Sequence, residues 1–161
     1  MFEITRDPDR RGYILHAECV LPRPVDEMFA FFSQPENLAK LTPPWMHFKI
    51  LTPEPIEMAA GTVLDYRVKI LKFVPMRWRS KITTWEPGVA FADTQVRGPY
   101  TRWDHDHRFE AVESGTRMID HVRYGVPGGG LVHRLLVKPD LEKIFAYRLE
   151  RQREWFGLIE A

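Results

Sequence analysis

The chain has 161 residues, of which 44% are hydrophobic and 28% are charged. One domain over residues 1–161 with a single core suits this length, without disulfides or a structural metal. The 23 basic and 22 acidic residues leave a net charge of +1, which excludes the strong field typical of proteins that bind nucleic acid or membrane surfaces.

The only cysteine, Cys19, has no partner for an internal disulfide or for a CxxC zinc motif, and the expected location is cytoplasmic. The opening stretch MFEITRDPDRRG is interpreted as the start of the domain and not as a targeting segment. No apolar run approaches the roughly 18 residues that a membrane span needs, so no span is expected.

The first predicted strand covers residues 13–21, where apolar and polar side chains alternate. Helical spacing follows Pro24, a residue that suits a first helical turn, and ends at residues 33–35. The apolar stripe of this helix is Val25, Met28, Phe29 and Phe32. A second short helix is predicted over residues 36–41.

Alternation then predicts strands in five segments, separated by Gly-Pro, Pro-Gly and Ser-Gly turn signals that imply sequential antiparallel hairpins. The segments are 45–53, 61–75, 76–88, 90–112 and 115–130. A short helical turn, a break near Pro139 and a long helix to residue 160 complete the chain. The inward stripe of that helix is Leu141, Phe145, Arg148, Gln152, Trp155 or Phe156, and Ile159. At about 33 Å it matches a ten-residue strand, so a sheet can wrap along it.

This order, with the segments RPVDEMFAFFSQPENLAKLTPPWM, GPYTRWDHDHRF, RMIDHVRYGVPGG and IFAYR, resembles the SRPBCC superfamily of START and Bet v 1-like helix-grip proteins. Within it, the chain looks most like the bacterial ligand-binding or polyketide cyclase/dehydrase-like branch. The resemblance covers nearly the whole chain. It implies an α+β helix-grip fold, in which a curved antiparallel sheet wraps a long C-terminal helix around a hydrophobic cavity. The hydroxylase branch of this superfamily requires a separate Rieske domain with cysteine and histidine pairs. This chain has one cysteine, so no cofactor is expected.

The segment TRWDHDHRF, residues 101–109, contains the first candidate site. Period two places Trp103, His105, His107 and Phe109 on one face and the charged residues on the other. If the aromatic face points inward, the same alternation on neighbouring strands and the apolar stripe of the last helix add further polar groups. These are Asp93, Gln95, Asp120 and Arg148.

Three interpretations of these groups remain open. In the first, His105 or His107 acts as an acid or base, and Asp93 or Asp120 fixes its tautomer. Enolate formation or dehydration in an aromatic cyclase would need such a pair. A structural polar network is favoured over catalysis, because no nucleophile is evident. The two histidines with a carboxylate could also ligate an ion, but positions i and i+2 are about 7 Å apart along a strand, so no metal is expected.

The expected function is the binding of a small hydrophobic metabolite that is lipid-like, polyketide-like or aromatic. The candidate ligand-binding residues are Phe32, Trp45, Tyr66, Trp78, Phe91, Gln95, Trp103, His105, His107, Phe109, Tyr124, Phe145 and Arg148. The alternatives are an aromatic cyclase or dehydratase, and a regulatory or scaffolding domain whose rings simply form a core. A homodimer is left open.

The entrance is expected between the short helices of residues 24–41 and the segment 125–138. The glycine run 128–130 in that segment is interpreted as either a gate or a plain linker.

Overall fold

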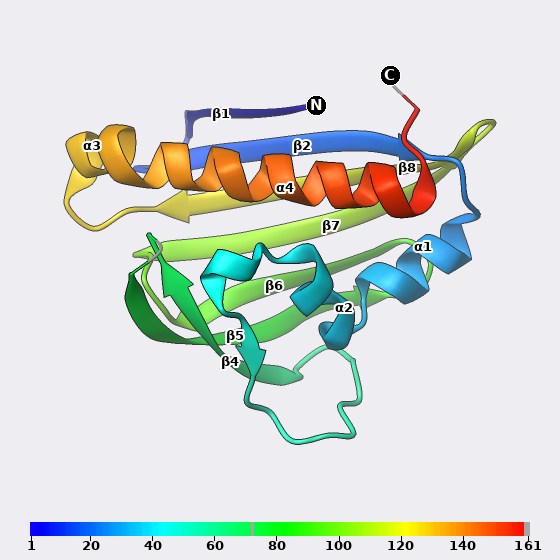
Figure 1. Ribbon diagram of the computed structural model, residues 1–161, viewed down its shortest axis with the longest axis horizontal. Coiled ribbons are helices and arrows are strands. Elements are labelled where there is room, and N and C mark those ends of the chain that lie inside the picture. Colours follow the sequence, from blue (N-terminus) through cyan, green and yellow to red (C-terminus); the bar gives the residue numbers. More distant parts are fainter. Residues whose placement is uncertain (72, 160–161) are drawn as a thin grey trace.

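The computed structural model describes residues 1–71 and 73–159, which form an eight-stranded antiparallel sheet with a long helix across one face (Figure 1). The strand order is β1-β2-β8-β7-β6-β5-β4-β3. The strands are β1 (Phe2–Arg6), β2 (Tyr13–Leu21), β3 (Lys49–Ile50), β4 (Val63–Ile70), β5 (Val74–Glu86), β6 (Ala90–Arg97), β7 (Arg102–Val112) and β8 (Gly115–Gly125). The helices are α1 (Val25–Phe32), α2 (Pro35–Leu41), a 3₁₀ turn (Pro44–Met46), α3 (Gly129–Val132), a π-helical turn (His133–Val137) and α4 (Lys138–Phe156).

The short helices α1 and α2 carry the chain from one half of the sheet to the other. After β2 the chain passes through both helices to β3 at the far edge and then returns strand by strand to β8, which pairs with β2. Consecutive antiparallel strands need only tight turns, whereas this single crossing needs the longer connection. The predicted α+β helix-grip architecture is confirmed.

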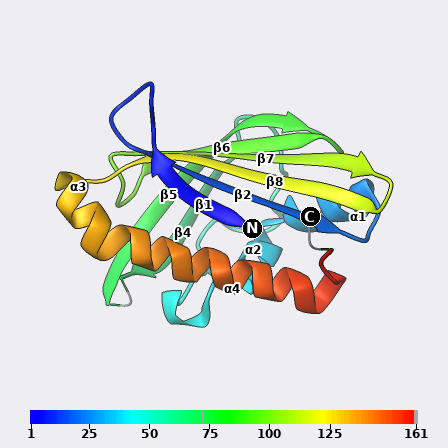
Figure 2. The same ribbon diagram turned by 90° about the horizontal axis from the view of Figure 1, so that it is seen from above.

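Helix α4 lies along the β2 and β8 half of the sheet, as both views show (Figures 1 and 2). Its buried side chains are Leu141, Phe145, Arg148 and Gln152. These positions recur every three or four residues, so they form one face of a 3.6-residue helix. Trp155 is 38% exposed, so the inward face includes the partly buried Phe156 in its place.

Two predicted strands are shorter than the sequence suggested. The segment 45–53 contributes only the two residues of β3, because consecutive prolines before Trp45 start a 3₁₀ turn. In the segment 61–75, β4 ends at Ile70 and Leu71 has a φ of 49°, which begins the turn to β5. Residue 72 lies outside the described residues. Strand β1 was not predicted, since its few residues carry little pattern.

The predicted break near Pro139 is wrong in position. Pro139 is the second residue of α4, which continues directly from the π-helical turn through Val137 in helical geometry, so the chain stays helical there. The irregularity is the π-helical turn just before it. Helix α4 ends at Phe156, beyond which Gly157 has a φ of 74°, and residue 160 lies outside the described residues.

Most of the buried apolar residues in the described part of the chain form three clusters. One joins α1 to β7 and β8 around Phe29 and Phe109, and a second joins β2 and β8 to α4 around Leu15 and Phe145. The third lies on β4 and β5 around Tyr66 and Trp78, away from α4. No helix in the described part of the chain is long and apolar enough to cross a membrane.

Candidate functional site

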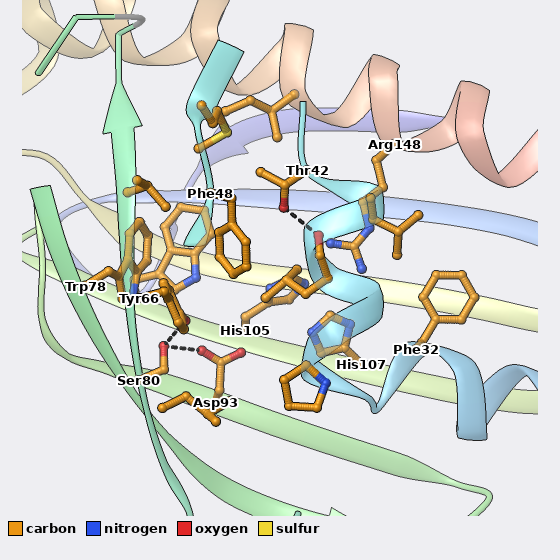
Figure 3. Close-up of a pocket in the computed structure, with 18 of the residues that line it drawn as sticks. Phe32, Thr42, Phe48, Tyr66, Trp78, Ser80, Asp93, His105, His107 and Arg148 are labelled. Atoms are coloured by element: carbon orange, nitrogen blue, oxygen red, sulfur yellow. Dashed lines mark hydrogen bonds between the residues drawn. The ribbon is translucent and has the colours of Figure 1, made fainter. Parts of the chain in front are cut away.

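A cavity of about 170 Å³ lies among these clusters. Its walls come from strands β4 to β7 on one side, and from α2, the segment after it and the first half of α4 on the other (Figure 3). Apolar side chains such as Leu64, Val68 and Ile144 make up most of the wall, and a few polar groups are collected on β5, β6 and β7. This mixture is typical of small-molecule sites.

The register of three neighbouring strands brings the polar groups together. Asp93 on β6 is opposite His105 on β7, and His107 is opposite Asp120 on β8. Side chains directly opposite each other on one face lie about 5 Å apart at Cβ, so each histidine has a carboxylate as its cross-strand neighbour. His105 and His107 are buried, and Asp106 between them is exposed.

One hydrogen-bonded chain holds Asp93. The Tyr66 hydroxyl lies 2.7 Å from Ser80 Oγ, which donates to Asp93 Oδ2 at 2.9 Å. Burial raises the pKa of the Asp93 carboxyl above its ordinary value, although the hydrogen bond from Ser80 opposes that change. Ser80 is 1% exposed, so its hydroxyl is committed to this chain.

Asp120 holds both histidines. His105 Nε2 lies 3.1 Å from Asp120 Oδ1 and His107 Nδ1 lies 2.6 Å from the same oxygen, although the His107 nitrogen is not aligned for a regular hydrogen bond. Burial alone would raise the pKa of Asp120, but the charge of Arg148, 3.8 Å away, and the contacts with the histidines hold that pKa well below its ordinary value. Asp120 is therefore a carboxylate and a hydrogen-bond acceptor only.

The two histidine rings lie in contact at a tilt of 35°, and the His107 ring stacks on Phe91. The His105 and His107 ring centroids are 3.8 Å apart, and the Phe91 ring lies 4.2 Å from that of His107. Burial, and then the nearby His105, lower the pKa of His107 to about 3, so its imidazole is neutral at neutral pH. The carboxylate of Asp120 favours the proton on the nearer nitrogen of each ring, Nε2 of His105 and Nδ1 of His107, which leaves the lone pairs on His105 Nδ1 and His107 Nε2.

Besides His107 Nδ1, which lies against Asp120, two buried donors on residues of the cavity wall have no hydrogen-bond partner in the described part of the chain. They are Trp78 Nε1 and Arg148 Nε. Arg148 reaches from α4 toward the histidines (Figure 3). A buried donor without a partner costs about 1–3 kcal/mol, so a group in the cavity that accepts these hydrogen bonds would be favoured.

Nine of the predicted ligand-binding residues line the cavity, and four do not. Those that line it are Phe32, Tyr66, Trp78, Phe91, Trp103, His105, His107, Phe145 and Arg148. Phe109 packs against Phe29 and Phe32 in the core. Tyr124 pairs with His133, whereas Gln95 bonds the backbone of Tyr100. Trp45 packs against Tyr147.

Of the four acid–base candidates, the two carboxylates lie in different places. Asp93 lines the cavity, but Asp120 lies behind the histidines in a small separate pocket with Cys19 and Gln152. The parity rule placed both on the inner face but could not tell a wall residue from one behind it.

Sequence reasoning did not select Ser80 and Tyr100 as site residues. Ser80 had a signal, because it lies between Trp78 and Ile82 on the inward parity of β5. Tyr100 had none, since it lies in the turn between β6 and β7. Of the two segments expected at the entrance, 24–41 contributes Phe32 and residues of α2 to the cavity wall, whereas 125–138 contributes none and its glycines begin α3.

A family model described as "Polyketide cyclase / dehydrase and lipid transport" matches residues 21–153. The chain belongs to this family. The match covers both short helices, strands β3 to β8 and most of α4, and it confirms the resemblance to the SRPBCC superfamily. No curated protein matches the chain.

Solved structures of low sequence identity share the fold of this polyketide cyclase/dehydrase family member. A protein from Chromobacterium violaceum is 14% identical, with a TM-score of 0.68 over 89% of this chain and 97% of the other. The Zhui aromatase/cyclase from Streptomyces sp. R1128 is 13% identical, with a TM-score of 0.67 over 93% and 92%. Ara h 8.0201 is 15% identical, with a TM-score of 0.57 over 94% and 99%.

Proposed function

We propose that the cavity binds one small, largely apolar molecule of one or two rings that carries an oxygen able to accept hydrogen bonds. The observation that carries this proposal is the cavity itself, with its apolar walls and the free donors of Trp78 and Arg148. Apolar contact supplies affinity, and the two donors orient the oxygen.

The volume sets the size of the ligand. An apolar cavity of about 150 Å³ is known to accept benzene, whereas sites for larger ligands measure roughly 300–1,000 Å³. At about 170 Å³ the cavity suits one ring or two small fused rings, and a long acyl chain or a multi-ring polyketide would require the walls to open. A cavity of this size also counts against a purely scaffolding domain with a filled core.

A dye-displacement assay tests the proposal. We expect an environment-sensitive apolar dye to bind the folded protein and to be displaced by a bicyclic ketone at lower concentration than by a bicyclic hydrocarbon of equal size. Sugars and nucleotides should not displace it. If the dye does not bind at tens of micromolar, or if nucleotides displace it as well as the ketone does, the proposal is wrong.

The role of Trp78 is tested by Trp78→Phe, which removes the N–H and keeps an aromatic ring. One hydrogen bond contributes about 1 kcal/mol, so the preference for the ketone should fall about fivefold while dye binding persists. Trp155→Phe is the matched control, because Trp155 lies outside the cavity wall and is 38% exposed. An equal loss in both variants would contradict the assignment of Trp78.

Acid–base catalysis on an aromatic or polyketide-like substrate is the second candidate, favoured by the contact between His105 and Asp120. In this candidate Asp120 orients His105, and His105 Nδ1 exchanges a proton with the substrate in the cavity. His107 is a poor base, since a pKa of about 3 lies far below neutral pH. His105→Gln should then abolish turnover and leave ligand binding intact, whereas a carrier has no turnover to lose.

A further inference from the structure

The groups of Asp93, His105 and His107 converge at one end of the cavity. Each offers one ligand atom, and these atoms all lie within 4.8 Å of one another. We propose that these three side chains bind one divalent first-row transition-metal ion, for which Zn²⁺ is the probe. Two imidazole nitrogens and one carboxylate oxygen are a donor set that such ions accept.

The spacing along the strand does not prevent this arrangement. Positions i and i+2 are about 7 Å apart along a strand, yet the two rings bend toward each other until their centroids are 3.8 Å apart. Ligand atoms around a tetrahedral zinc with bonds of about 2.0–2.2 Å lie roughly 3.4 Å apart, so separations within 4.8 Å must shrink by no more than about 1.4 Å. Side-chain rotation can supply a movement of this size.

The groups behind the three ligands resemble the outer shell of a metal site. Histidines that bind a metal almost always give their other ring N–H to a carboxylate, a carbonyl or water, which fixes the tautomer. Asp120 takes this position for both His105 and His107, and its contact leaves Nδ1 of one ring and Nε2 of the other with lone pairs. Ser80 likewise holds the Asp93 carboxylate.

The local charge also favours a cation. Metal ligation requires ionised carboxylates and neutral imidazoles, and in those forms Asp93 and Asp120 outweigh the single guanidinium of Arg148 by one negative charge. The guanidinium lies 3.8 Å from Asp120 Oδ1, so this carboxylate offsets part of its positive charge. A divalent ion would change the net charge of the site from −1 to +1. The same ion among uncharged groups would leave a buried charge of +2, which costs more.

The cavity leaves a coordination position open beside the three ligands, because all three side chains line it. Three protein ligands with an open position are the arrangement of catalytic zinc sites, where water or a ligand oxygen completes the coordination. This inference stands apart from the proposed binding of an apolar molecule, since the ion requires only these side chains.

The test is a titration of chelator-treated full-length protein with Zn²⁺ by calorimetry, repeated with Co²⁺ to record the visible absorption of the bound ion. We expect one equivalent to bind. Asp93→Asn and His107→Phe should each remove the Co²⁺ spectrum, and Asp120→Asn should weaken binding by about 10–100-fold because it only orients the histidines. Circular dichroism identifies a variant that has not folded. If one of the two ligand variants, Asp93→Asn or His107→Phe, does not fold, the Co²⁺ spectrum of the other decides.

The matched control removes the other histidine pair. His16 and His121 face each other across β2 and β8 on the outer side of the sheet, with ring centroids 6.0 Å apart, and a surface pair of this kind binds zinc adventitiously. The double variant with His16→Gln and His121→Gln should bind as the wild type does. The proposal is overturned if the wild type binds no ion, or if only the double variant loses binding. Dye binding by metal-free protein separates this failure from a failure of the proposed function.

Discussion

At the scale of single residues, one carboxylate oxygen organises the site. Asp120 Oδ1 is approached by His105 at 3.1 Å, by His107 at 2.6 Å and by Arg148 at 3.8 Å. A buried carboxylate is tolerated only when such partners replace its water, and each partner in turn is held in one orientation. Asp120 is therefore a positioning residue, and the cavity walls contain the groups it positions.

A third buried histidine, His133, has a different partner and allows a prediction about pH. Its Nε2 lies 2.9 Å from the Tyr124 hydroxyl, and its ring stacks on Tyr13 with centroids 3.4 Å apart. Burial, followed by the positive charges of Lys138 and Arg6, lowers the pKa of His133 in the folded protein below the ordinary 6.5. The unfolded chain thus takes up a proton at a higher pH than the folded protein does.

The free energy of unfolding should therefore fall as the pH decreases from about 6.5 toward the lower folded pKa, with a contribution from His133 of at most about 1.4 kcal/mol per pH unit. His133→Phe keeps a ring on Tyr13 but cannot titrate, so the slope in this window should decrease, whatever the loss in absolute stability. Urea unfolding at a series of pH values measures it. His16→Phe, on the outer face, is the control; an unchanged slope in His133→Phe would contradict the prediction.

At the scale of elements, helix α4 and the strands follow their periodicities closely. The alternation in β7 places Trp103, His105, His107 and Phe109 on the concave side, and the 3.6-residue period of α4 places Phe145 and Arg148 opposite them. The Phe145 ring is 4% exposed and lies 6.2 Å from that of Phe2. It connects the helix to the sheet and forms part of the cavity wall.

Phe145→Ala should lower the free energy of unfolding by about 3–5 kcal/mol, because it removes a buried ring and enlarges the space beside it. The same substitution at Phe73, which is 82% exposed, is the control and should change stability by less than about 0.5 kcal/mol. Chemical denaturation measures both. Equal effects of the two substitutions would show that α4 does not depend on this contact.

At the scale of the whole molecule, the cavity exists because the long helix covers only part of the curved sheet. Helix α4 lies over β2 and β8, and α2 approaches the other half, where β4 and β5 curve away (Figures 1 and 2). The apolar cluster on β4 and β5 therefore does not reach α4, and the space between them stays empty. Close packing of interiors makes such a space unusual unless a ligand uses it.

Filling the cavity should separate binding from folding. Val68 is 3% exposed and lines the cavity, so Val68→Trp places an indole in the empty space. We expect dye affinity to fall at least about tenfold, with a change in stability no larger than the roughly 1–3 kcal/mol of overpacking. Val96→Trp, at a position that is 58% exposed, is the matched control. Unchanged dye binding in Val68→Trp would place the dye elsewhere on the protein.

The sequence pattern predicted helices and strands well where alternation or proline signals are strong. It predicted them poorly where backbone geometry decides the structure. Strand β2 and helices α1 and α2 lie at or within one residue of their predicted bounds, because alternation and proline signals act over a few residues. Strand β1, the 3₁₀ turn before β3 and the turn at Leu71 were missed, since each depends on backbone geometry that side-chain type only weakly encodes.

The sequence by itself determined the helix-grip class, the inward face of each long strand and the polar residue types on that face. Only the tertiary structure decided which groups meet. The register of β6, β7 and β8 sets Asp93 beside His105 and His107 beside Asp120, and the curl of the sheet brings Arg148 over them. It also decided that Phe109 and Tyr124 belong to the core and not to the cavity. Periodicity reports the face of a single element, whereas register and curvature arise from packing between elements distant in the chain.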